Sequence, residues 1–104
     1  LRAMSDELSA EDRKLLTLAR ATRARTAAAE GAAVRDTDGR TYAGATVSLD
    51  SLQVSAVGVC IAMAVASGSR GLEAVVLMGA EELRADDAAA IKEFAGEDVV
   101  VHLR

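Results

Sequence analysis

The chain has no proline, two aromatic residues, one cysteine and one histidine among its 104 residues. A single cysteine, Cys60, excludes a disulfide within the chain. Because Cys60 lies in an apolar stretch with no basic neighbour, we expect it to be a small core residue and not a reactive thiol. With only Tyr42 and Phe94 as aromatics, the core must be filled by Ala, Val, Leu and Ile, whose small side chains bring the elements close together.

An excess of basic residues is also missing. The 12 Lys and Arg are outnumbered by 16 Asp and Glu, and the net charge is −4. Phosphate binding needs a basic face, so this balance argues against a nucleic-acid partner. Arg20, Arg23 and Arg25 form one local exception, which is either a solvated helix face or a docking patch for a partner.

Charge is absent from the 19 residues between Ser51 and Ser69. This length barely reaches the minimum for a membrane span, about 18–20 residues, and serine and glutamine dilute it. The stretch therefore predicts a central helix that begins at Asp50-Ser51, ends near Gly68 and is covered on all sides. The first residues form no apolar signal segment, so we expect a cytoplasmic protein with no membrane contact.

The remaining patterns predict one domain over residues 1–104, with residues 1–8 disordered or foreign to the fold. Ser9 is expected to cap a first helix that Gly31 stops. An Asp36–Gly39 turn should join two antiparallel strands, and the last two strands should be parallel because a helix joins them. The expected order is α-β-β-α-β-α-β, with elements at 9–31, 32–35, 40–48, 51–68, 73–78, 85–94 and 99–103. We predict an α/β fold of three layers, α/β/α, around a mixed sheet of about four strands.

This order, together with LLTLARATRAR, the run EGAAVRDTDGRTYAGATVSLDS and a closing Glu93-Phe94, resembles the cytidine deaminase family. Zinc-dependent base deaminases carry a His/Cys-x-Glu motif and a Pro-Cys-x-x-Cys motif. Three nitrogen or sulfur ligands hold the zinc, and the glutamate moves the proton. The resemblance therefore implies the cytidine deaminase-like fold and a zinc-dependent hydrolase reaction.

The residues of that chemistry are missing here. When the sequence is aligned with the family pattern at Gly39 and Gly44, Val57 falls at the position of the first zinc ligand and Val59 at that of the glutamate. Counting back from Glu93-Phe94 places Arg84 and Asp87 at the other two ligands. Valine cannot bind a metal and arginine repels one, so we expect no zinc and no other cofactor. His102, the single histidine, is expected to be an ordinary strand residue.

Three functions stay open. The first is a catalytically inactive, cytidine deaminase-like scaffold or binding protein that forms a homodimer or homotetramer. Its interface would lie on Gly58, Ala62 and Ala66, a small-residue row that could equally pack against the chain's own sheet. The second is an active nucleoside deaminase with an unusual metal site from Asp87, Cys60 or His102. The third is a non-catalytic nucleoside sensor, because the resemblance places Thr46 and Ser48 where the family binds ribose.

Overall fold

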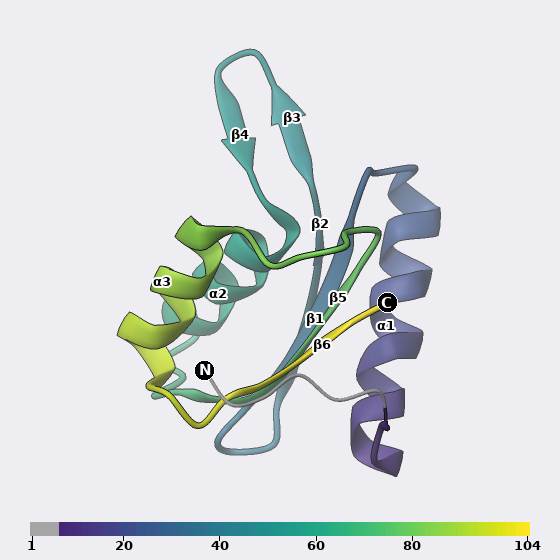
Figure 1. Cartoon of the computed structure of the whole chain (residues 1–104). Coiled ribbons are helices and arrows are strands. Elements are labelled where there is room, and N and C mark those ends of the chain that lie inside the picture. The colour runs from purple at the N-terminus through teal and green to yellow at the C-terminus, as the bar shows by residue number, and fades with distance from the viewer. Residues whose placement is uncertain (1–6) are drawn as a thin grey trace.

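The computed structural model describes residues 7–104, which form one mixed sheet between helices on both faces (Figure 1). The helices and strands are α1 (Ala10–Thr26), β1 (Gly31–Asp36), β2 (Thr41–Ala45), β3 (Val47–Leu49), β4 (Leu52–Val54), α2 (Ala56–Ala66), β5 (Leu72–Met78), α3 (Ala85–Ala95) and β6 (Val100–Leu103). Of the residues expected to lie outside the fold, 1–6 are outside the described part, and Glu7 and Leu8 form no helix or strand.

The four-stranded sheet has the order β2-β1-β5-β6. The β1–β2 and β1–β5 pairs are antiparallel and the β5–β6 pair is parallel. The three-layer mixed α/β fold, its hairpin and its parallel β-α-β unit are therefore confirmed. In the hairpin, Gly39 has a φ of 88°, a conformation that glycine adopts without strain.

Alternation along the strands builds two apolar layers. Val34, Val75 and Val101 point into the layer beneath α2 and α3, whereas Ala33 and Val76 point into the layer beneath α1. Strand β1 is buried on both faces, as expected for an interior strand of an α/β fold. Figure 1 shows α1 alone on one face and α2 with α3 on the other.

Two predicted boundaries are wrong because of close contacts that sequence patterns do not reveal. The first helix ends at Thr26 and not at Gly31, and Ala27 turns the chain with a φ of 52°. Gly31 instead begins β1, where a side chain would collide with the carbonyl oxygen of Ala19. The second strand was expected over 40–48 but breaks at Thr46, whose N–H donates to the carbonyl of Glu30 at 3.1 Å.

The central helix begins later than predicted. Asp50 and Ser51 form the turn of a two-stranded ribbon, β3–β4, which is separate from the main sheet (Figure 1). The helix start is Ser55, whose hydroxyl accepts the N–H of Gly58 at 2.9 Å. The helix is also not covered on all sides, because Ala62, Val65 and Ala66 are exposed in the single chain. Among the described residues, no helix has both the length and the hydropathy to cross a bilayer.

Candidate functional site

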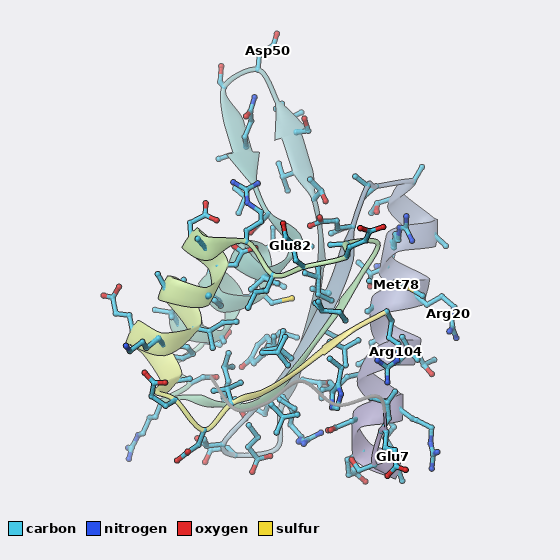
Figure 2. The ribbon with its side chains drawn as sticks, in the orientation of Figure 1. Glu7, Arg20, Asp50, Met78, Glu82 and Arg104 are labelled. Atoms are coloured by element: carbon cyan, nitrogen blue, oxygen red, sulfur yellow. The ribbon has the colours of Figure 1, made fainter. Side chains whose placement is uncertain are left out.

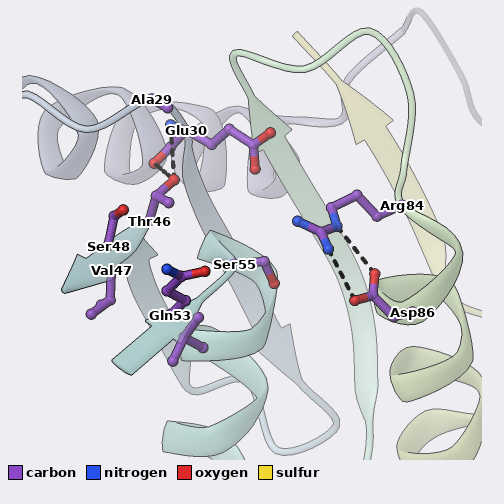
Figure 3. A pocket seen from close by; sticks show the side chains of 10 residues that line it. Ala29, Glu30, Thr46, Val47, Ser48, Gln53, Ser55, Arg84 and Asp86 are labelled. Carbon is purple, nitrogen blue, oxygen red and sulfur yellow. Dashed lines mark hydrogen bonds and ion pairs between the residues drawn. The ribbon is translucent and has the colours of Figure 1, made fainter. Parts of the chain in front are cut away.

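A cavity of about 330 Å³ opens where the helix starts meet the end of the sheet (Figure 3). Five parts of the chain form its wall: the segment before β1, the β2–β3 junction, strand β4, the start of α2 and the start of α3. Its lining residues are Ala29, Glu30, Thr46, Val47, Ser48, Gln53, Val54, Ser55, Arg84 and Asp86.

Thr46 and Ser48, the two residues named from the sequence as a remnant ligand pocket, both line this cavity. Thr46 is fixed, because its Oγ1 accepts the N–H of Glu30 at 3.1 Å. Ser48 lies opposite Gln53 across the ribbon, and Figure 3 shows both side chains near the cavity. Their hydroxyl and amide make no hydrogen bond to residues 7–104 that would compete with a ligand.

The rim of the cavity carries an ion pair. The Nε and Nη2 atoms of Arg84 donate to the two carboxylate oxygens of Asp86, each at 3.2 Å (Figure 3). This hydrogen bonding raises the pKa of Arg84 and lowers the pKa of Asp86. Both side chains are largely exposed, so we expect the pair to contribute little to stability. Glu30 adds a further carboxylate across the cavity, so the lining is polar with a slight negative excess.

A hydrogen bond joins the starts of α2 and α3. The Ser55 hydroxyl caps α2 and donates to Oδ1 of Asp87 at 2.6 Å. Asp87 is buried in the first turn of α3, and its Oδ2 atom has no hydrogen-bond partner within residues 7–104. A carboxylate is favoured there because two helix N-termini converge on it.

The four zinc-site positions do not fit a metal. Val57 is fully buried in the core. Val59 packs on strand β2, where its Cγ1 would lie 2.8 Å from a side chain on Gly44. Arg84 points to Asp86, and Asp87 is held by Ser55, so one carboxylate is the only metal-ligating group among the four. Across residues 7–104, no three His, Cys, Asp or Glu side chains are grouped closely enough to hold a metal ion.

Cys60 and His102 lie on opposite faces of the sheet. Cys60 belongs to α2 and lies in the core on the inner side of that helix, and burial raises the pKa of its thiol to about 12. His102 faces α1, where its Nε2 lies 2.8 Å from Oδ2 of Asp12. Asp12 Oδ1 lies 3.0 Å from Nη2 of Arg35, close enough for an ion pair but poorly aligned for a hydrogen bond. The residues of the alternative metal site therefore do not converge, and His102 belongs to a buried charged network.

The small-residue row on α2 lies on the outside of the molecule. Ala62 and Ala66 are exposed, so they do not pack against the chain's own sheet. Gly58 is half-buried because Val54 of the ribbon covers it. Val65, 53% exposed, extends the same uncharged helix surface.

Sequence reasoning missed several lining residues. Glu30, Gln53 and Asp86 come from segments that the fold alone brings together, and Arg84 was named only as a lost zinc-ligand position. For Ser55 a signal was present, because serine directly before an apolar helical run is typical of an N-cap. Ser51, four residues earlier, gives the same N-cap signal, and the sequence therefore predicts the helix start at Ser51 and not at Ser55.

Comparison with known proteins gives the family. A family model described as cytidine deaminase-like matches residues 8–104. The cytidine deaminase of Mycobacterium leprae has a similar structure, with a TM-score of 0.77, 22% identity and coverage of 89% of this chain and 87% of that one. For the cytidine deaminase of Mycobacterium tuberculosis, the TM-score is 0.76, the identity 20% and the coverage 89% and 85%. For that of Burkholderia pseudomallei, the corresponding values are 0.72, 20%, 86% and 79%. No curated protein matches significantly.

Proposed function

Since this chain belongs to the cytidine deaminase-like family, we propose that it is a catalytically inactive member that acts as a homo-oligomeric binding module. The observation that carries the proposal is the chemistry of the two helix starts. Hydrocarbon side chains, Val57 and Val59, stand at the positions that the resemblance assigns to a zinc ligand and to the glutamate. A base deaminase needs both groups to activate water and move its proton.

The alternative of an active deaminase requires a new ligand set. Asp87, Cys60 and His102 were the available groups, but Cys60 and His102 are separated by the sheet. This geometry favours the inactive protein.

Metal analysis and a turnover assay test the loss of catalysis together. We expect zinc far below one ion per chain in untagged protein, and no conversion of cytidine to uridine by spectrophotometry. Near-stoichiometric zinc, with turnover that disappears in Asp87→Ala, would overturn the proposal. Turnover that persists in Asp87→Ala at low zinc would point to an assay contaminant and would leave the proposal standing.

Oligomerisation is supported by the exposed surface of α2. A helix with no charged residue presents Ala62, Val65 and Ala66 to solvent, and small residues allow close approach of another helix. An uncharged apolar helix face of this kind is typical of a protein–protein contact. We propose that a second copy covers it, forming a homodimer or homotetramer.

Sedimentation velocity tests this interface. Ala62→Glu should shift the protein toward monomer, because a charge would be buried between two copies. Ala21→Glu is the matched control, since Ala21 is also exposed but lies on α1. A monomeric wild type, or an Ala62→Glu oligomer as tight as the wild type, would contradict the α2 interface.

The open cavity supports a second candidate, a non-catalytic nucleoside sensor. Thr46 and Ser48 line the cavity, and Ser48 and Gln53 offer hydroxyl and amide groups to a polar ligand. Thermal denaturation with cytidine, uridine, adenosine and guanosine tests this role. A rise in midpoint that Gln53→Leu abolishes and Gln53→Asn retains in part is expected; no rise at millimolar nucleoside contradicts it.

A further inference from the structure

Helix α1 carries an excess of positive charge in an acidic chain. It holds five of the 12 Lys and Arg residues but two of the 16 Asp and Glu residues. Of these two acids, Asp12 is buried, and Glu11 forms an ion pair with Lys14 at 3.2 Å. Within residues 7–104, no carboxylate pairs with the remaining basic side chains of the helix, which are Arg13, Arg20, Arg23 and Arg25.

Three of these arginines lie along one side of α1. Residues three, four or seven positions apart share a face of a helix. This spacing places in one row Arg13, Leu16, Arg20 and Arg23. Arg25 is two positions beyond Arg23 and therefore lies on a different side of the helix.

Two open hollows follow the row, and we call them together the α1 groove. One, of about 380 Å³, lies between the C-terminal half of α1 and the end of β5, and is lined by Arg20, Arg23, Ala24, Ala27, Ala28 and Met78. The other is lined by Leu8, Arg13 and Leu16, together with Glu7 and Arg104. Leu16 and Met78 are half-buried and pack on the core beneath α1, so the groove has an apolar floor beside its guanidinium groups. Figure 2 labels Arg20 and Met78 on this side of the molecule.

The fold positions one of these guanidinium groups. Nε of Arg23 donates to the carbonyl oxygen of Ala28 at 3.4 Å. The group lies against Gly79, where a side chain would begin 3.0 Å from Cζ of Arg23. Its two Nη atoms make no hydrogen bond within residues 7–104, so they can donate to a group from outside the chain. Because the side chain is already held, binding costs less conformational entropy than it would for a freely moving arginine.

We infer that the α1 groove binds an acidic, partly apolar segment of a partner protein. The paired N–H groups of a guanidinium match the two oxygens of a carboxylate, so the arginine row would hold acidic side chains. Leu16 and Met78 would take the apolar side chains, and the flexible thioether of methionine adapts to different shapes. Figure 1 shows α1 on the opposite face of the sheet from α2, so this inference goes beyond the proposed homo-oligomer and does not depend on it.

A peptide is favoured over phosphate as the occupant. Proteins that bind single-stranded nucleic acid stack the bases on aromatic side chains. The two aromatic residues, Tyr42 and Phe94, pack against the core on the other side of the sheet, beneath α2 and α3. A helix that lies on a membrane presents several large apolar side chains to it, whereas on α1 the large apolar residue that is exposed is Leu18, at 37%.

The spacing of the arginines defines a probe. Arg13 and Arg20 are seven residues apart, which is about 10.5 Å along a helix axis and equals about three residues of an extended peptide. A fluorescein-labelled peptide Glu-Leu-Ala-Glu-Leu-Ala-Glu therefore places its carboxylates at the matching interval. Fluorescence anisotropy at low ionic strength should give saturable binding with a Kd below about 100 μM. The same peptide with serine in place of leucine should bind at least about tenfold more weakly, because the apolar floor is then unused.

Two double variants of equal charge test where the peptide binds. Arg13→Glu with Arg20→Glu should weaken binding at least about 30-fold, because two guanidinium contacts are lost and replaced by repulsion. Lys14→Glu with Arg25→Glu is the matched control: these residues are about three turns apart on another side of α1, and their replacement should weaken binding less than about threefold. Far-UV circular dichroism should show the same helix content in all three proteins.

Three outcomes would overturn the inference: no saturable binding of the leucine peptide up to about 1 mM, equal weakening by the two double variants, or tighter binding of an oligothymidylate or of phosphatidylserine vesicles than of the peptide. Ala62→Glu, on the other face of the sheet, should leave peptide binding unchanged. Loss of peptide binding in the Arg13/Arg20 variant with an unchanged sedimentation coefficient therefore separates this surface from the α2 interface.

Discussion

Replacement of Asp36 tests how the hairpin end of the sheet is held. Asp36 ends β1, is fully buried and is surrounded by donors. Its Oδ1 accepts the backbone N–H groups of Asp38 at 3.0 Å and Arg40 at 2.8 Å. Its Oδ2 accepts the Ser69 hydroxyl at 2.5 Å and Nε of Arg40 at 3.1 Å. The carboxylate thus ties the turn to the segment that leads into β5.

Asp36→Asn preserves the shape of the side chain and changes half of these contacts. The amide oxygen still accepts the two backbone N–H groups, but the amide nitrogen is a donor and faces the Arg40 guanidinium. That ion pair is half-exposed, so its loss costs about 0.5–1 kcal/mol. Ser69 loses a buried hydrogen bond to a charged acceptor, which costs about 1.5–3 kcal/mol. Together the free energy of unfolding should fall by about 2–4 kcal/mol.

Urea denaturation followed by circular dichroism measures this change. Asp38→Asn is the control, because Asp38 is 66% exposed and its contact to Arg40 is 3.5 Å long, so its loss should cost under about 0.5 kcal/mol. A decrease below about 1 kcal/mol for Asp36→Asn, or equal decreases for the two variants, would refute the proposed role of the buried carboxylate.

The pH dependence gives a second test of the same residue. Burial opposes ionisation of Asp36, but hydrogen bonds from Ser69 and the turn amides outweigh it and lower its pKa. A lowered folded-state pKa stabilises the protein above the unfolded value of about 3.9. That stability is lost as pH falls through the folded-state pKa. Asp36→Asn should therefore lose less stability on acidification than the wild type.

Three further substitutions test the helix starts and the charged network. Ser55→Ala removes the α2 cap and a 2.6 Å hydrogen bond to a buried carboxylate, so the free energy of unfolding measured in urea should fall by about 2–3 kcal/mol. Ser51→Ala in the exposed turn is the control and should change it by less than about 0.5 kcal/mol. Equal effects of the two substitutions would contradict the assigned cap. Gly44→Ala should destabilise by about 1–3 kcal/mol through collision with Val59, and Val59→Ala should relieve part of it in the double variant; additive effects in that cycle would refute the contact. The pKa of Asp12 lies below its usual value because the hydrogen bond with His102 and the nearby positive charge of Arg35 outweigh burial. Asp12→Asn should therefore be destabilised at neutral pH and lose less stability than the wild type as pH falls below about 4. Parallel acid profiles for the two proteins would count against this.

The elements that could be predicted are those with local signals. A few neighbouring residues are enough to predict three of these elements: the Asp-Gly turn, strand β5 from its apolar run, and the start of α3 from its acidic first turn. The ribbon could not be predicted in this way. Ser51 and Ser55 are equally good helix caps in sequence, and the choice between them depends on Val54, which packs against Gly58 only after the chain has folded.

Of the residues that line the cavity, the sequence named only those that the family resemblance supplied. Thr46 and Ser48 follow from the resemblance, and the structure places both in the cavity lining. Arg84 was read from the sequence as a lost ligand position, and no pattern indicated that it would pair with Asp86 on the opposite rim. The partners of Asp12 could not be read either, because His102 is 90 residues away along the chain.

The contact between Ser55 and Asp87 explains how the two helix starts can stay together without a metal. A zinc ion between them would join α2 to α3 through its ligands. Here a hydroxyl and a buried carboxylate join the same two turns, and the helix dipoles favour the negative charge. Val57, in the first turn of α2, adds a fully buried apolar side chain beside this contact. Because apolar burial and one hydrogen bond hold the helices in place, this pair of helix starts does not need a metal ion to keep its geometry.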